Sequence, residues 1–154
     1  MERIELNLLK SELYAGIKEI EKLFLDIDDR KKGIKTSKAK LESLAYKLHN
    51  LYCAFEDLFK IVARHFENQV EDIAKYHKEL LKRMCLQIEG VRPALLSEET
   101  FKTLDELRAF RHFFRHGYAY ELKYEKLKPV IKGADKLRGL YKGDIERFLK
   151  ELEV

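Results

Sequence analysis

Proline and glycine are scarce in this chain of 154 residues, which contains two prolines and seven glycines. The scarcity excludes a fold of many short strands, because the turns between such strands draw heavily on both residue types. Apolar residues make up 45% of the chain and charged residues 38%. This balance favours long amphipathic helices, and the length fits one compact domain spanning residues 1–154 with its own hydrophobic core.

Long hydrophobic runs are also lacking. The opening segment, MERIELNLLK, has charged residues among its apolar ones, so it forms neither the apolar stretch of a signal peptide nor a membrane span. We therefore expect a cytoplasmic protein without membrane attachment. No repeat of 20 to 50 residues is present, which excludes a solenoid.

Only two cysteines occur, Cys53 and Cys85, and both fall at apolar positions of predicted helices. We expect small buried thiols rather than a disulfide or a pair of metal ligands. The net charge of +4 is compatible with a phosphate-rich partner but is too small to identify one.

Apolar residues recur in steps of three and four along most of the chain, which is the spacing of one buried helix face. The second of these stripes is the longest, from Leu41 to Val62, and the aromatic Tyr52, Phe59 and Phe66 widen it. Short polar segments separate the stripes, so we predict an all-α fold, an antiparallel bundle of four to five helices. The predicted helices cover residues 6–28, 41–66, 70–89, 97–117 and 127–152.

Several residues mark where these helices begin and end. Thr36 or Ser37 is a suitable N-cap for the second helix, and Ser97 is one for the fourth. Gly90, as a left-handed cap, and Pro93, which cannot continue a helix, are predicted to end the third helix near residue 89. The fourth helix is predicted to close at Gly117. In the last helix three glycines are predicted to kink or split the segment; these are Gly133, Gly139 and Gly143.

One polar cluster stands out near the end of the fourth predicted helix. Its members are Arg108, Arg111, His112, Arg115, His116, Tyr118 and Tyr120. Arg111 is the most unusual of them, because the steps from Leu107 to Arg111 to Phe114 place its guanidinium on the face that should be buried. A charge on a buried face requires a specific reason.

An arginine and a histidine together suit cleavage of RNA, whose 2′-hydroxyl can attack the adjacent phosphate once a base removes its proton. Histidine titrates near neutral pH, and the planar guanidinium of arginine matches two phosphate oxygens. We assign these roles to His116 and Arg111. Five positions rotate two side chains by about 140° on an ideal helix. A helix end at Gly117 would free His116 to turn towards Arg111, and the carbonyl end of the helix dipole would favour imidazolium.

The spacing Arg111-x4-His116 resembles the Arg-x4-6-His signature of HEPN domains, and with Tyr118 it resembles the fuller form found in HepT toxins. In this composition about 0.3 matches to Arg-x4-His are expected by chance, and about 0.02 once the tyrosine is required. The segments KYHKELLKRM, VRPALLSEET and FRHFFRHGYAYEL extend the resemblance over most of the chain, and the first helix contributes least to it.

The resemblance implies a helical HEPN domain that forms a homodimer, in which two Arg–His pairs make a composite cleft and cleave RNA without a metal or other cofactor. It also implies a partner, an MNT-type nucleotidyltransferase antitoxin that adenylylates Tyr118. Further RNA contacts are expected from Arg108, His112, Arg115 and Tyr120. In HEPN nucleases the residue after the motif arginine is often small and polar, whereas this chain has His112 there.

Simpler interpretations of the same residues remain open. Arg111 could form a structural ion pair with Glu67 or Asp57 of the second helix, and His116 could cap the end of its helix. His112 and His116 have the spacing of half a zinc site, yet no acidic or cysteine ligand stands at matching spacing, so no metal is expected.

Two other functions also remain open. The chain could be a non-catalytic helical module that binds a nucleotidyltransferase or a nucleotide in the same cleft, or it could be a structural scaffold. The scaffold is disfavoured, because the polar cluster occupies positions where a scaffold prefers leucine.

Overall fold

The computed structural model describes residues 1–67, 73–116 and 121–153, without side chains for residues 73–77 and 116. The predicted all-α fold is confirmed. Within the described ranges the only β pairing is a single bridge between Ile88 and Arg92. The helices are α1 (Arg3–Arg30), α2 (Lys38–Phe66), α3 (Ile73–Arg83), α4 (Glu98–His116) and α5 (Tyr124–Leu152).

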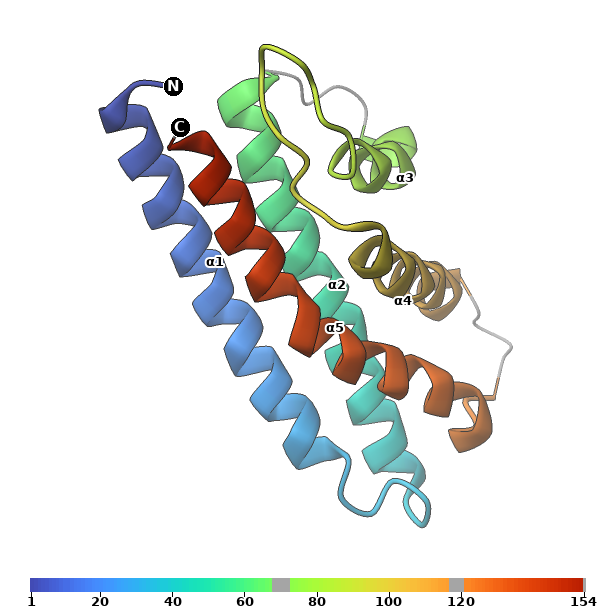
Figure 1. The fold of residues 1–154 in the computed structure, drawn as a ribbon. Helices are drawn as coiled ribbons and strands as arrows, with labels where there is room; N and C mark the ends of the chain where they lie inside the picture. The colour runs from blue at the N-terminus through green and yellow to red at the C-terminus, as the bar shows by residue number, and fades with distance from the viewer. Residues whose placement is uncertain (68–72, 117–120, 154) are drawn as a thin grey trace.

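The three long helices form the body of the molecule (Figure 1). α1 and α2 are antiparallel, α5 lies along both of them, and α4 packs against α2 and α5. The short α3 rests on α2 and α4. The described helices include none that is both long enough and apolar enough to cross a membrane.

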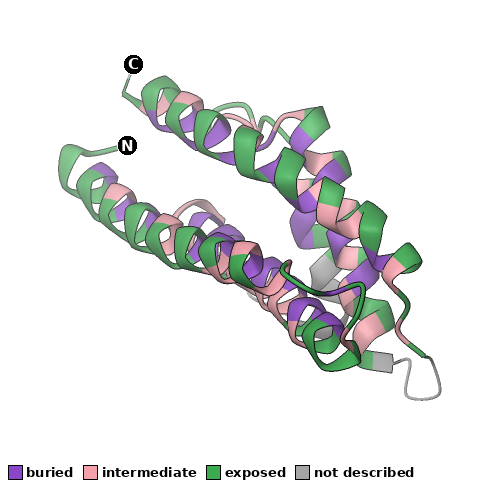
Figure 2. Ribbon diagram, turned by 90° about the horizontal axis from the view of Figure 1, so that it is seen from below, coloured by how far each residue is buried: buried purple, intermediate pink, exposed green. Residues whose placement is uncertain are grey.

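The core lies where the predicted stripes of the long helices meet. Buried positions face the interior of the bundle, and exposed positions cover its outside (Figure 2). At the centre the ring of Tyr141 packs edge-on against Phe55 at a centroid distance of 5.2 Å and stacks on Phe24 at 6.0 Å. The predicted stripe of α2 is buried throughout, at Leu41, Leu44, Leu48, Leu51, Phe55, Leu58 and Val62.

The start of α4 is held by α5, as well as by its own N-cap. The hydroxyl of Ser97 accepts a hydrogen bond from the backbone N–H of Thr100 at 3.2 Å, as its predicted capping role requires. The buried Asp144 of α5 accepts hydrogen bonds from the backbone and the hydroxyl of Ser97, at 2.9 and 3.1 Å. Arg147 donates to the carbonyl of Leu95 at 3.0 Å. These bonds determine where α4, and the polar cluster on it, lies against α2.

The end of α3 differs from the prediction, which placed it near residue 89. The helix ends at Arg83 because the following carbonyls bond outside the helix. The carbonyl of Arg83 accepts from the side chain of Arg92 at 3.0 Å, and the carbonyl of Met84 accepts from the backbone N–H groups of Leu95 and Leu96, at 2.9 and 3.0 Å. Gly90 has the positive φ expected of it, at 77°, but in a turn beyond the helix.

A kink or a split is predicted for the last helix at its glycines, and the split does not occur. α5 is one helix from Tyr124 to Leu152, although it bends (Figure 1) and contains Pro129. Glycine costs about 1 kcal/mol in a helix interior, whereas the buried face of α5 packs against three other helices. Tertiary packing outweighs the weak local propensity.

The cysteines are free, as predicted, but they are only partly buried. Burial, followed by the nearby carboxylates of Asp144 and Glu98, raises the pKa of the Cys85 thiol to about 11. Cys85 is therefore a protonated, unreactive thiol at neutral pH.

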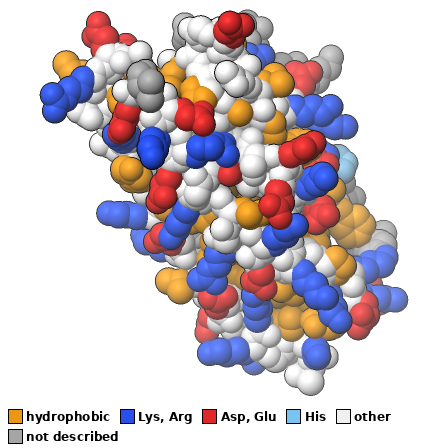
Figure 3. Space-filling view, in the orientation of Figure 1, with side chains coloured by type: hydrophobic (Ala, Val, Ile, Leu, Met, Phe, Trp, Pro, Cys, Tyr) orange, Lys and Arg blue, Asp and Glu red, His pale blue; other side chains and the backbone are white. Residues whose placement is uncertain are grey.

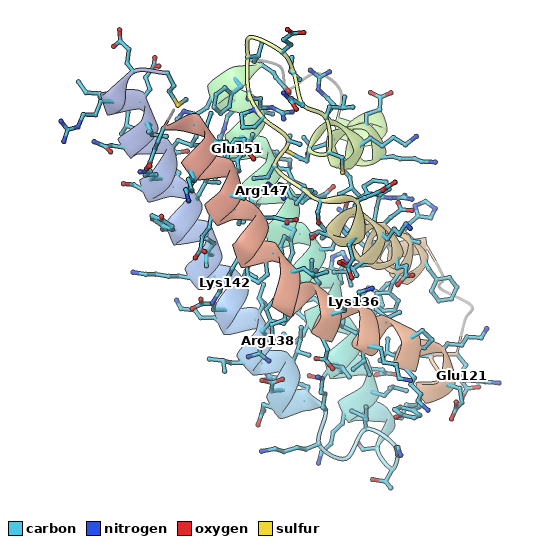
Figure 4. The ribbon with its side chains drawn as sticks, viewed as in Figure 1. Glu121, Lys136, Arg138, Lys142, Arg147 and Glu151 are labelled. Atoms are coloured by element: carbon cyan, nitrogen blue, oxygen red, sulfur yellow. The ribbon has the colours of Figure 1, made fainter. Side chains whose placement is uncertain are left out.

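Ion pairs join the outer faces of α1 and α5, and Figure 4 labels their α5 members, Arg138 and Lys142. Arg138 lies 2.8 Å from Asp28, and Lys142 pairs with Glu21. Figure 3 shows acidic and basic side chains interspersed over this face of the molecule. Exposed pairs of this kind contribute little stability each, typically below about 1 kcal/mol.

Candidate functional site

The polar cluster of α4 faces polar side chains on one face of α2, which are His49, Tyr52 and Glu56. Arg111 lies on the buried side of α4, as its spacing predicts, and its side chain is 14% exposed. Its nearest carboxylate is Glu56 of α2, whose side chain is 4% exposed. The Nη2 atom of Arg111 lies 3.9 Å from Oε1 of Glu56, which is an ion-pair distance but longer than a hydrogen bond.

This partner differs from those predicted. Asp57 is exposed on the outside of α2. Glu67 instead binds Arg92, with 2.7 Å between Nη2 and Oε1, and Arg83 at 3.2 Å. The α2 residue opposite Arg111 is Glu56.

Arg92 and Arg111 are both largely buried, but their surroundings differ. The Arg92 side chain is fully buried, and every guanidinium nitrogen donates hydrogen bonds, to Glu67 or to backbone carbonyls. In contrast, Nε of Arg111 is buried without a hydrogen-bond partner among the described residues. Arg92 has the environment of a structural arginine, whereas Arg111 keeps hydrogen-bonding capacity unused.

His49 of α2 lies beside the same arginine. Its ring packs against Phe114 of α4 at a centroid distance of 5.6 Å, and its Nε2 lies 3.8 Å from the Cys53 sulfur. Burial lowers the pKa of His49, and the positive charges of Arg111 and Arg115 lower it further. The imidazole is therefore neutral at physiological pH.

Tyr52 completes the α2 side of the site. Its hydroxyl is buried and has no hydrogen-bond partner within the described part of the chain. Burial, with a smaller contribution from the Glu56 carboxylate, raises the pKa of Tyr52 above its ordinary value, so the phenol stays protonated. His49, Tyr52 and Glu56 follow one another in steps of three and four, so they share one face of α2.

The other α4 residues of the cluster are placed differently. Arg108 is held by Asp105 on its own helix, with 2.8 Å between Nη2 and Oδ1. Arg115 is exposed and close enough to His49 to lower its pKa. His112 is also exposed. Arg115 thus shares the α2-facing side of α4 with Arg111.

His116 is the last described residue of α4. Gly117, where the helix is predicted to close, lies outside the described residues. The side chain of His116 is not among the described parts of the structure, and neither Tyr118 nor Tyr120 is a described residue. Their predicted roles therefore remain predictions.

The sequence interpretation missed the α2 half of the site. His49 was given no role, and Tyr52 was assigned to the apolar stripe. A usable signal does exist, since a histidine and a glutamate seven positions apart flank that stripe on one side. Among the described residues, no group of three His, Cys, Asp or Glu side chains is placed to hold a metal ion.

The low pKa of His49 has a consequence for stability. Its ordinary value is 6.5, so below about this pH the unfolded chain binds a proton that the folded protein resists. The free energy of unfolding should fall as pH drops from 7.5 to 5.5, and His49→Gln should reduce that fall. Urea denaturation of both proteins at the two pH values measures the difference. If the free energy of unfolding fell equally in the two proteins between these pH values, His49 would not be held neutral.

Comparison with known proteins supplies the family. Residues 43–152, from the second turn of α2 to the end of α5, match the model of a family described as HepT-like protein. No curated protein and no solved structure matches the chain. The family match covers well over half of the sequence and includes both halves of the candidate site. The chain therefore belongs to the HepT-like family.

Proposed function

We propose that this protein is a metal-independent endoribonuclease, the toxin of a toxin–antitoxin pair. The observation that carries the proposal is the state of Arg111, a largely buried guanidinium that lies 3.9 Å from its counter-ion and whose Nε has no hydrogen-bond partner among the described residues. A purely structural arginine is expected to bond its carboxylate at 2.7–2.9 Å, as Arg92 bonds Glu67. The geometry of Arg111 suits an arginine whose free hydrogen-bonding capacity binds an anionic ligand.

The chemistry requires no metal. An imidazole accepts the proton of the RNA 2′-hydroxyl, the 2′-oxygen attacks the adjacent phosphorus, and the bond from phosphorus to the 5′-oxygen breaks. An imidazolium gives a proton to that 5′-oxygen, leaving a 2′,3′-cyclic phosphate and a 5′-hydroxyl. His116 supplies the imidazole, and a homodimer supplies two of them in one cleft. Arg111 neutralises the charge that develops on the phosphate.

Tyr118 provides regulation in this proposal. It follows His116 by two positions, so an adenylyl group attached to its hydroxyl would bring bulk and a phosphate charge beside the catalytic histidine. The added charge repels the RNA backbone. We propose an MNT-type nucleotidyltransferase as the partner that attaches it, and a mass increase of one adenylyl group on Tyr118 after co-expression tests this step.

The experiment that tests the nuclease is incubation of the purified protein with single-stranded RNA in EDTA. We expect cleavage to products with cyclic phosphate ends, and growth arrest on expression of the protein alone. Cleavage that EDTA abolishes would contradict the metal-independent mechanism. No cleavage and no growth arrest would favour the other function considered, a non-catalytic module that binds a nucleotide or a nucleotidyltransferase through Arg111.

A further inference from the structure

The positive charge of the protein is concentrated in two short segments. Residues 30–40 and 123–132 together contain ten basic residues and one acidic residue, so they carry a charge of +9. The whole chain has a net charge of +4, which leaves −5 for the remaining residues. The basic residues are Arg30, Lys31, Lys32, Lys35, Lys38, Lys40, Lys123, Lys126, Lys128 and Lys132.

The fold brings the two segments together at the end of the bundle where α1 turns into α2 (Figure 1). The ammonium of Lys35 lies over the ring of Tyr124, the first residue of α5, 5.4 Å from the ring centroid. Lys31 reaches Asp135 of α5 at 2.7 Å. Between the loop and α5 lies a hollow of about 310 Å³, to which Thr36 and Ile131 also contribute.

Most of these lysines form no ion pair with a carboxylate of the described residues. Arg30 and Lys31 are neutralised by aspartates of α1 and α5. Six further lysines are exposed and form no ion pair within the described ranges. We call this group the basic end; its members are Lys32, Lys35, Lys38, Lys40, Lys128 and Lys132. The cations further along α5, such as Arg138 and Lys142, are paired with α1.

The arrangement is unfavourable for the isolated protein. Lys38 and Lys40 lie in the first turn of α2, which contains no acidic residue, so their charges meet the positive end of the helix dipole. Six like charges that form no ion pair among the described residues also repel one another. An anionic ligand would relieve both effects.

We propose that the basic end, with the ring of Tyr124, binds the phosphate backbone of single-stranded RNA; this rests on the proposed function and extends it to a second contact surface on the substrate. Lysines on a hydrated surface bind phosphates without reading sequence, and an aromatic ring stacks on a base. Protein–protein interfaces, in contrast, are depleted of lysine.

The position is suitable for a strand that also enters the Arg111 site. Seven residues separate the end of α4 at His116 from the start of α5 at Tyr124, so these two residues are at most about 29 Å apart. Residues 30–40 lie outside the segment that matches the HepT-like family, so the family match does not account for the loop half of this surface.

The test replaces four lysines of the basic end with glutamine: Lys32, Lys35, Lys128 and Lys132. Binding of a fluorescent, fully 2′-O-methylated RNA oligonucleotide is measured by anisotropy over a range of salt concentrations, because this RNA has no 2′-hydroxyl to react. We expect the affinity at low salt to fall at least tenfold and the slope of log K against log salt to decrease by roughly 2–3, at about 0.7 per lost phosphate contact. With cleavable RNA, KM should rise while kcat changes little.

The matched control removes the same charge elsewhere, by glutamine at four other exposed lysines without ion pairs among the described residues: Lys18, Lys78, Lys102 and Lys150. Equal effects of the two sets on binding would overturn the proposal. Unchanged RNA affinity with lost binding of an acidic protein partner would also overturn it and assign the surface to that protein. Failure of the native protein to cleave RNA would reject the nuclease and leave the binding comparison valid.

Discussion

Replacing Arg111 or His116 with alanine is expected to abolish metal-independent RNA cleavage and to relieve growth arrest. Loss of one preorganised donor to a developing oxyanion lowers kcat by about 100- to 1000-fold. Loss of a general acid or base lowers it by about 100- to 10,000-fold. If the two residues act on one phosphate, the double variant should be scarcely slower than the slower single variant. The rate of RNA cleavage in EDTA, followed by analysis of the products, is measured for the two single variants and the double variant.

Alanine at Arg111 also leaves Glu56 buried beside a smaller side chain, so a loss of activity could reflect a loss of folding. Arg111→Lys separates the two, because it keeps the charge and removes the planar fork; we expect a drop in kcat of at least about tenfold with little change in helical circular dichroism. Arg64→Ala and His65→Ala on α2 serve as controls of the same residue types. Native cleavage rates in Arg111→Ala would place the active site elsewhere.

The sequence predicts that Arg111 lies on the buried face of its helix, and it also predicts the all-α bundle. Each apolar stripe follows from the 3.6-residue period of the helix, which the sequence displays directly. Ser97 was predicted as an N-cap, and its hydroxyl accepts the expected backbone hydrogen bond. These features depend on residues close together in the chain, so local spacing suffices to find them.

The partner of Arg111 could not be predicted in the same way. Glu56 and Asp57 are adjacent, yet they point about 100° apart on the helix, so one is buried and the other exposed. Which of them meets α4 depends on how the two helices are rotated and crossed. That geometry follows from packing along the whole length of α2, α4 and α5, which no single stretch of sequence contains.

The end of α3 also depends on contacts that the local sequence pattern does not contain. A helical period continues past Arg83 in the sequence, and Ile88 fits it. The backbone leaves the helix because Arg92 and the N–H groups of residues 95 and 96 bond the carbonyls of residues 83 and 84. Local periodicity carries no information about such competing donors, so the contacts of Arg92 cannot be predicted from it.

Arg92→Met is expected to cause the largest loss of stability among the substitutions considered. The fully buried guanidinium bonds Glu67 and the carbonyls of Arg83, Leu86 and Pro93. Removing one partner of a buried ion pair costs about 3–5 kcal/mol, because the other charge stays buried. A domain of this size typically has 5–15 kcal/mol of stability in total. We expect Tm to fall by about 6–20 °C, measured by thermal denaturation.

Arg83→Met provides the matched control, because Arg83 binds the same carboxylate from a position that is 39% exposed. Its loss should cost less than about 1 kcal/mol. Replacing Arg92 and Glu67 together with Met and Leu should recover part of the stability lost in Arg92→Met, since no unpaired charge then remains. Equal effects of Arg92→Met and Arg83→Met would show that the Glu67 carboxylate is solvated. In that case the loop from α3 to α4 would be held by apolar packing at Leu95 and Leu96, both of which are buried.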